Sequence, residues 1–137
     1  MSDLDKFTIR RATAADIAAV QALLNANLNT VLPRADDEMN DLINSFFIVD
    51  HLGKIAGCCC LEVYSPKIAE LRSLAVDVEY RGKGIGSRLV KKAVEEFKRL
   101  GIKQLLAVTS NIEFFKGHDF GPCLNEKFAL FWNGKYL

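Results

Sequence analysis

The glycine-rich stretch Arg81-Gly82-Lys83-Gly84-Ile85-Gly86 follows the apolar run 71–78 and directly precedes a strongly helical segment. Where a strand, a tight turn and a helix start meet, backbone N–H groups lack partners and the positive end of the helix dipole is exposed. Both features favour a bound phosphate or diphosphate. Gly84 and Gly86 also lack the Cβ atoms that would keep phosphate oxygens away from the backbone. The stretch therefore predicts an anion-binding turn, although a plain strand-to-helix connection fits the same residues.

Two common phosphate-binding motifs do not occur in this stretch. It has no G-x-x-x-x-G-K-[ST] run, and the spacing of Gly82, Gly84 and Gly86 differs from G-x-G-x-x-G. The sequence therefore disfavours a nucleoside triphosphatase and a dinucleotide-dependent dehydrogenase.

The pattern that does fit is R-x-x-G-x-G after L-x-V, carried by Leu74, Val76, Arg81, Gly84 and Gly86. It resembles the coenzyme A diphosphate motif of the GNAT superfamily of N-acetyltransferases. The resemblance covers most of the chain. In segments 31–34, 69–76 and 114–115 the chain is most similar to the acetyltransferase domain of N-acetylglutamate synthases, in a single-domain form without their kinase domain. The resemblance implies acetyl-CoA as co-substrate and no metal.

Length and composition predict one domain over residues 1–137, large enough to bury a core. A formal net charge of +1 gives no overall field that would attract nucleic acid or an anionic membrane. The N-terminus lacks a signal-peptide pattern and no apolar run is long enough to span a bilayer, so a cytoplasmic protein is expected. Cys58, Cys59, Cys60 and Cys123 have no metal-ligand spacing. The oligomeric state stays open, a homodimer included.

Hydrophobic patterns predict the element order β-α-α-β-β-β-α-β-α-β. Strands are expected at 7–11, 46–50, 54–64, 68–76 and 102–108, helices at 14–28, 35–44, 84–100 and 111–116, and one or two edge strands in the aromatic tail with Phe128, Leu130, Phe131 and Trp132. This is the order of the GNAT fold, an α/β (α+β) fold with a mixed, mostly antiparallel sheet of six or seven strands and helices on both faces. The resemblance implies that strands 70–76 and 102–108 splay apart around the pantetheine arm.

The resemblance also implies which groups hold the donor. The main chain of Leu74, Ala75 and Val76 would bind the pantetheine and the acetyl group, with an N–H of Leu74 directed at the thioester oxygen. The diphosphate would be held by the turn and the helix start, which comprise Arg81, Gly82, Lys83, Gly84, Ile85, Gly86 and Ser87.

Acetyl transfer to an amine also needs a base, because the acceptor amine arrives mostly protonated. Glu70 matches a glutamate of the synthases and is the expected base; a salt-bridged strand carboxylate is the alternative, and Glu62 is a weaker rival. Many superfamily members place a tyrosine near position 115 as the acid, but this chain has Phe115. Ser110 or Thr109 could supply a hydroxyl or ordered water, a helix cap fits either residue equally well, and the thiolate could leave unassisted.

Two arginines bear on the acceptor. A guanidinium binds a carboxylate through two parallel hydrogen bonds, so an arginine at the acceptor site selects amino acids. Arg34 matches the substrate-binding arginine of the synthases, and Arg72 lies two residues beyond Glu70. Alternatively, Arg34 is a charge that opens the second helix, and Arg72 pairs with Glu70 or Glu62.

The sequence thus predicts an N-acetyltransferase that moves the acetyl group of acetyl-CoA to the amine of a small molecule, with the amine attacking the thioester directly and the α-amine of glutamate as a candidate acceptor. The alternatives are another amine or a protein N-terminus as acceptor, or a non-catalytic module that binds coenzyme A and regulates a partner.

Overall fold

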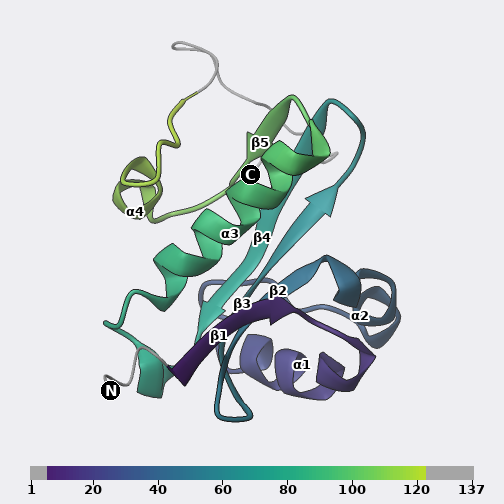
Figure 1. The fold of residues 1–137 in the computed structure, drawn as a ribbon, viewed down its shortest axis with the longest axis vertical. Helices are drawn as coiled ribbons and strands as arrows, with labels where there is room; N and C mark the ends of the chain where they lie inside the picture. The colour runs from purple at the N-terminus through teal and green to yellow at the C-terminus, as the bar shows by residue number, and fades with distance from the viewer. Residues whose placement is uncertain (1–5, 123–137) are drawn as a thin grey trace, which may run out of the picture.

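The computed structural model describes residues 6–122, which form five strands and four α-helices (Figure 1). In chain order they are β1 (Phe7–Arg11), α1 (Ile17–Asn25), α2 (Asp36–Leu42), β2 (Phe46–His51), β3 (Lys54–Val63), β4 (Ile68–Val76), α3 (Ile85–Leu100), β5 (Gln104–Leu106) and α4 (Ile112–Lys116). Short 3-10 turns lie at Ala14–Asp16, Ile43–Ser45 and Val78–Tyr80. The expected tail strands and Cys123 lie outside the described residues.

The strands form one sheet in the order β1-β2-β3-β4-β5. Neighbours from β1 to β4 are antiparallel, whereas β4 and β5 are parallel. Helix α3 covers one face, and α1 and α2 cover the other (Figure 1). The predicted mixed, mostly antiparallel sheet with helices on both faces is confirmed.

Strand alternation divides the core into two layers, because successive side chains point to opposite faces. On the α3 side, Phe47, Cys59 and Leu71 pack in one cluster with Leu89 and Val90. The apolar stripe of α3 therefore finds a matching apolar sheet face, which fixes the helix across the middle strands.

On the opposite face, Cys58 and Cys60 pack in a cluster with Leu24 of α1 and Met39 of α2. Burial raises the pKa of both thiols to about 12, and it raises the pKa of Cys59 well above its ordinary value. These three thiols stay protonated at neutral pH and serve as small core residues, not as nucleophiles.

Strands β4 and β5 diverge soon after they meet. Their pairing starts at Ile68–Gln104 and ends at Glu70–Leu106, so residues 71–76 of β4 have no ladder partner on that side within the described chain. The divergence that the resemblance implied is therefore present. It leaves main-chain groups of β4 free beyond Glu70, where an extended ligand could add like a further strand.

Helix α1 and strand β5 depart most from their predicted lengths. Helix α1 ends at Asn25 because the Asn27 side chain donates to the Leu23 carbonyl at 2.8 Å and replaces the backbone bond of a continuing helix. Strand β5 covers only 104–106 of the expected 102–108, since the sheet opens at Leu106 and the residues beyond lose their partner.

Candidate active site

Strand β4 carries a bulge where it passes the expected acetyl-binding segment. Cys58 pairs with Ala75 but Cys60 pairs with Arg72, so the single residue between the two cysteines faces both Ser73 and Leu74. Ser73 adopts φ +55°, a left-handed conformation that is unusual for a residue other than glycine. The extra residue re-aims the main chain just before Leu74, whose N–H is the predicted donor to the thioester oxygen.

Beyond β4 the glycine-rich turn leads into α3 with its backbone exposed. Gly82 and Gly84 both have φ +78°, and a Cβ added to either would meet no atom within 4 Å. The amides of Ile85, Gly86 and Ser87 form no hydrogen bond with another residue of the 6–122 range, and the first helical bond of α3 is made by Arg88 to Gly84. The three free amides therefore lie at the positive end of a sixteen-residue helix, next to the open positions of Gly82 and Gly84.

Contacts on two sides hold this turn in place. Arg81 donates from Nη2 to the Asn27 side-chain oxygen at 2.8 Å and from Nε to the Val76 carbonyl at 3.4 Å. Ser87 Oγ lies 3.0 Å from Nε2 of His118, which follows α4. Arg81, expected to add charge beside the phosphates, also fastens the turn to the end of α1.

Gly86 differs from the other two glycines of the turn, Gly82 and Gly84. A Cβ added there would lie 3.5 Å from the Phe114 ring and 3.8 Å from a Val76 methyl, an ordinary packing distance. Side chains of α4 and β4 thus occupy the space next to Gly86, whereas the space next to Gly82 and Gly84 is open. Free helix-start amides with glycines at open positions are a cradle that a diphosphate fits.

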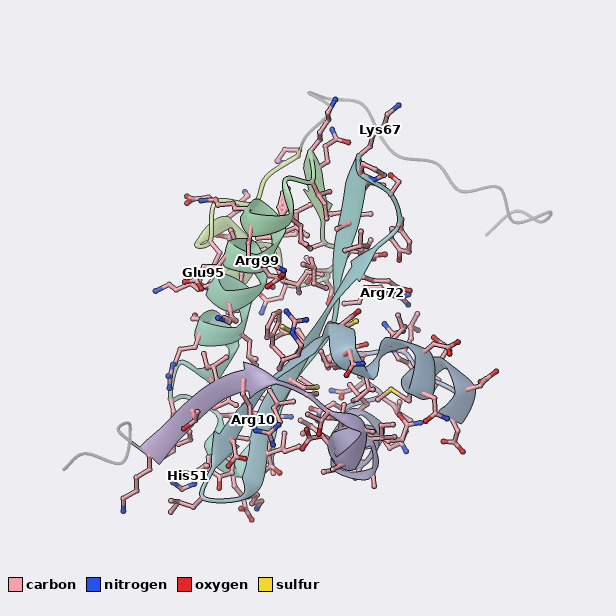
Figure 2. All side chains as sticks on the ribbon, turned by 45° about the vertical axis from the view of Figure 1, so that its right-hand side comes forward. Arg10, His51, Lys67, Arg72, Glu95 and Arg99 are labelled. Carbon is pink, nitrogen blue, oxygen red and sulfur yellow. The ribbon has the colours of Figure 1, made fainter. Side chains whose placement is uncertain are left out.

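A charged cluster lies at the end of β3 and in the first half of β4, on the sheet face that α1 and α2 cover. Glu62 pairs with Glu70 in the strand register. Arg72 donates from Nη1 to Glu62 at 3.0 Å, and its Nε lies 4.0 Å from Glu70. Figure 2 shows Arg72 projecting away from α3, above α2. The Glu70–Arg72 pair that the strand spacing suggested is therefore confirmed. Glu62 is a third member of the charged cluster.

Tyr64 holds both glutamates of this cluster. Its hydroxyl donates to Glu70 at 2.7 Å and lies 3.3 Å from Glu62. Burial, together with the hydrogen bond to Glu70, raises the pKa of Tyr64 to about 12, so the hydroxyl remains a donor at neutral pH. Tyr64 was not among the predicted site residues; its two-residue spacing from Glu62 at the end of β3 was the available signal.

Arg34 enters the same cluster from the segment before α2. Its Nε donates to the Ser73 hydroxyl at 2.8 Å, its Nη1 contacts Glu38 at 3.1 Å, and its Nη2 lies 3.7 Å from Glu62. The Arg34 side chain is only 2% exposed, and its Nη2 has no hydrogen-bond partner in the described part of the chain. Arg34 thus supports the β4 bulge and forms ion pairs within the protein, while its contact with an acceptor stays a prediction.

The segment between β5 and α4 has no phenol at the predicted acid position, since Phe115 is buried in the α3-side core. Ser110 is exposed. The helix cap is Asn111, whose side chain accepts from the Phe114 amide at 3.3 Å, and Thr109 accepts from the Asn111 amide at 2.9 Å. The hydroxyl of Ser110 is therefore not used as a cap, and its role toward the leaving thiolate stays a prediction.

The family comparison agrees with this geometry. A model of the acetyltransferase (GNAT) family matches residues 18–120. The chain belongs to the GNAT family. It is an acetyl-CoA-dependent N-acetyltransferase, as the R-x-x-G-x-G motif predicts.

Among GNAT relatives, an uncharacterized N-acetyltransferase of Chlorobaculum tepidum is 37% identical over 122 residues, 88% of this chain and 79% of that protein. An amino-acid acetyltransferase of Mycobacterium tuberculosis is 28% identical and matches 82% of this chain and 67% of its own length. The N-acetylglutamate synthase of Neisseria gonorrhoeae, solved with coenzyme A and N-acetylglutamate, superposes with a TM-score of 0.77 at 27% identity. That match covers 82% of this chain and 27% of the synthase.

The described residues were also compared with the patterns of a metal site and of a membrane-spanning helix. Within residues 6–122 no three histidine, cysteine or acidic side chains gather as metal ligands would. The same residues include no helix that is both long and apolar enough for a membrane span.

Proposed function

We propose that this GNAT enzyme acetylates the α-amine of a small amino acid. Three observations support the proposal. Relatives that match most of this chain are named amino-acid acetyltransferases. Glu70, the candidate base, lies next to Arg72, which is 29% exposed. Both residues lie on β4 just before the bulge at Ser73 that leads to the predicted thioester-binding segment.

The single observation that carries the proposal is the placement of a base and a carboxylate-binding group on one strand face. Residues two apart on a strand lie on the same side, about 7 Å apart along the chain. An α-amino acid carries its amine and its carboxylate on one carbon. If Arg72 binds the carboxylate, the amine of the same molecule can therefore reach Glu70 or a water held by it.

In the proposed reaction the neutral amine attacks the acetyl carbonyl carbon directly. Glu70, directly or through one water, takes the proton that the amine must lose. A main-chain N–H of β4 at Leu74 stabilises the oxyanion as the C–N bond forms. The C–S bond then breaks, and the thiolate leaves as coenzyme A and takes up one proton. Because a thiol has a pKa near about 8.5, its thiolate is a tolerable leaving group even without an acid.

The relatives' names suggest glutamate as the acceptor to test first. The side chains of this chain support the amino-acid class as a whole, since they provide one partly exposed arginine beside the candidate base.

The experiment is a thiol-release assay with acetyl-CoA and the twenty amino acids, polyamines and a peptide with a free N-terminus. We expect release with one or more amino acids, and a strong rise in KM for that amino acid in Arg72→Ala. Release with polyamines or peptide alone would replace the proposal by acetylation of another amine. Tight binding of acetyl-CoA without release for any acceptor would instead support a regulatory module.

A further inference from the structure

The charged cluster has three carboxylates for two arginines. Arg34 contacts Glu38 and Glu62, and Arg72 contacts Glu62 and Glu70. With all five groups ionised the cluster carries a net charge of −1. The side chains of Arg34, Glu62 and Glu70 are 2%, 18% and 15% exposed, so solvent screens these charges less than it screens those on the surface, whereas Glu38 is 48% exposed and its charge is screened more strongly.

The two arginines differ in what they can offer a ligand. Nε and Nη1 of Arg34 are hydrogen-bonded to Ser73 and Glu38, and Nη2 lies 3.7 Å from Glu62 without a hydrogen bond in the described part of the chain. The Arg34 side chain is almost fully covered, so a ligand could reach Nη2 only if the cluster rearranged. Arg72 is 29% exposed, and only its Nη1 and Nε face glutamates. Since a guanidinium has five N–H donors, Arg72 keeps free donors for a carboxylate.

One accessible arginine in a cluster of net negative charge suits an acceptor with one carboxylate. A second carboxylate would need Arg34, whose Nη2 is directed toward Glu62, and it would be repelled by the three glutamates. We infer that Glu62 is the specificity-determining residue of this enzyme, and that it selects α-amino acids with an uncharged or cationic side chain over dicarboxylic ones. The inference rests on the proposed function and narrows its acceptor class.

The discriminating acceptors are isosteric pairs, glutamine against glutamate and asparagine against aspartate, because each pair differs only by the second charge. We measure kcat/KM for both members with the wild-type enzyme and with Glu62→Gln. The wild-type enzyme is expected to favour the amide over the acid at least tenfold. Glu62→Gln removes the carboxylate that lies between Arg34 and Arg72 and should lower this preference at least tenfold, chiefly by raising activity on the acid.

Glu79→Gln is the matched control. Glu79 is an exposed glutamate that pairs at 2.7 Å with Lys54, which lies at the opposite end of β3 from Glu62. It should leave the amide-to-acid ratio unchanged. Glu38→Gln removes the other partner of Arg34 and gives a second test if Glu62→Gln folds poorly; it should shift the ratio in the same direction.

The outcomes separate this inference from the proposed function. A wild-type preference for the acids, or a ratio that stays within twofold in both Glu62→Gln and Glu38→Gln, overturns the inference and leaves amino-acid acetylation standing. If the wild-type enzyme acetylates no amino acid at all, both are overturned.

Discussion

Glu70 is the residue on which the proposed chemistry depends. Its carboxylate accepts a 2.7 Å hydrogen bond from Tyr64 and lies 4.0 Å from Arg72, so its position is fixed by two neighbours. A base that is held in place needs no reorganisation when the amine arrives. The fold thus fixes where the Glu70 carboxylate lies, and the carboxylate itself is the group that accepts the proton.

Glu70→Gln should reduce kcat by a factor of about 100 or more, because an amide cannot take the proton of the amine. The glutamine oxygen can still accept the Tyr64 hydrogen bond, so the structure and the affinity for acetyl-CoA should persist. Steady-state kinetics and calorimetry measure the two effects. A kcat within twofold of wild type would show that another group is the base.

Ser73 combines backbone strain with a hydrogen bond to Arg34. Ser73→Ala and Ser73→Gly both remove the acceptor at 2.8 Å from the buried Arg34 Nε, at a cost of about 1–3 kcal/mol. Glycine also relieves the left-handed strain of about 1–2 kcal/mol, which exceeds its chain-entropy cost of about 0.5–1 kcal/mol. Ser73→Gly should therefore be the more stable variant in urea unfolding. Equal stabilities would show that the φ of +55° carries no strain.

At the scale of elements, the start of α3 joins the sheet to the predicted diphosphate site. Its N-cap, Gly84, and its C-cap, Gly101, have φ values of +78° and +70°, and a Cβ added to either meets no atom within 4 Å. The two ends of α3 therefore share a left-handed glycine, but only Gly84 lies at the predicted diphosphate site. This pairing gives a matched test of the cradle.

Gly84→Ala and Gly101→Ala should each lose about 1 kcal/mol of stability through left-handed strain. Only Gly84→Ala should weaken acetyl-CoA binding, by about tenfold or more, because its new methyl stands among the free amides. Thermal unfolding and calorimetry check the pair. Equal cofactor affinity in both variants would argue against a diphosphate at this turn.

A second link between elements is pH-dependent. Arg10 of β1 binds Asp16 before α1 through two hydrogen bonds of 2.8 and 2.9 Å. The hydrogen bond from Arg10, opposed by partial burial, lowers the pKa of Asp16 from 3.8 to about 2. Because the folded-state pKa is depressed, the stabilisation is complete above the unfolded pKa of about 4 and is lost as the pH falls toward 2.

Asp16→Asn should therefore lower the free energy of unfolding by about 1–2 kcal/mol at pH 7. The pKa shift alone would suggest more, but the Arg10 side chain is 38% exposed, so solvent partly screens the ion pair. The stability difference from wild type should shrink between about pH 4 and pH 2. Urea unfolding of both proteins across this range measures it. A difference that stays constant with pH would show that the ion pair contributes nothing.

At the scale of the whole molecule, the helices on both faces of the sheet bury the cysteine thiols of β3 and protect them from reagents. Cys58, Cys59 and Cys60 lie in the middle strand of the sheet, and each is fully buried. Their raised pKa values leave almost no thiolate at pH 8. Only the assembled sheet with helices on both faces produces this protection.

Iodoacetamide at pH 8 should leave Cys58, Cys59 and Cys60 unmodified in the native protein and alkylate all three after unfolding. Peptide mass spectrometry locates the label and keeps these positions apart from Cys123. Rapid native labelling at any of the three would contradict the burial and reopen a role for a thiol in the reaction.

The sequence by itself determined the elements and the cofactor motif, because helix and strand periodicity and the glycine pattern are local properties of the chain. It placed α3, β4 and the glycine-rich turn at nearly their observed bounds, and it offered Glu70 as a partner of Arg72 through the two-residue repeat of a strand. Only the tertiary structure decided the bulge at Ser73, the point where β4 and β5 part, and the enclosure of Arg34 by Glu38 and Glu62. These depend on register and on contacts between distant segments, since a strand pattern fixes which side chains share a face but not which residue of the next strand lies opposite.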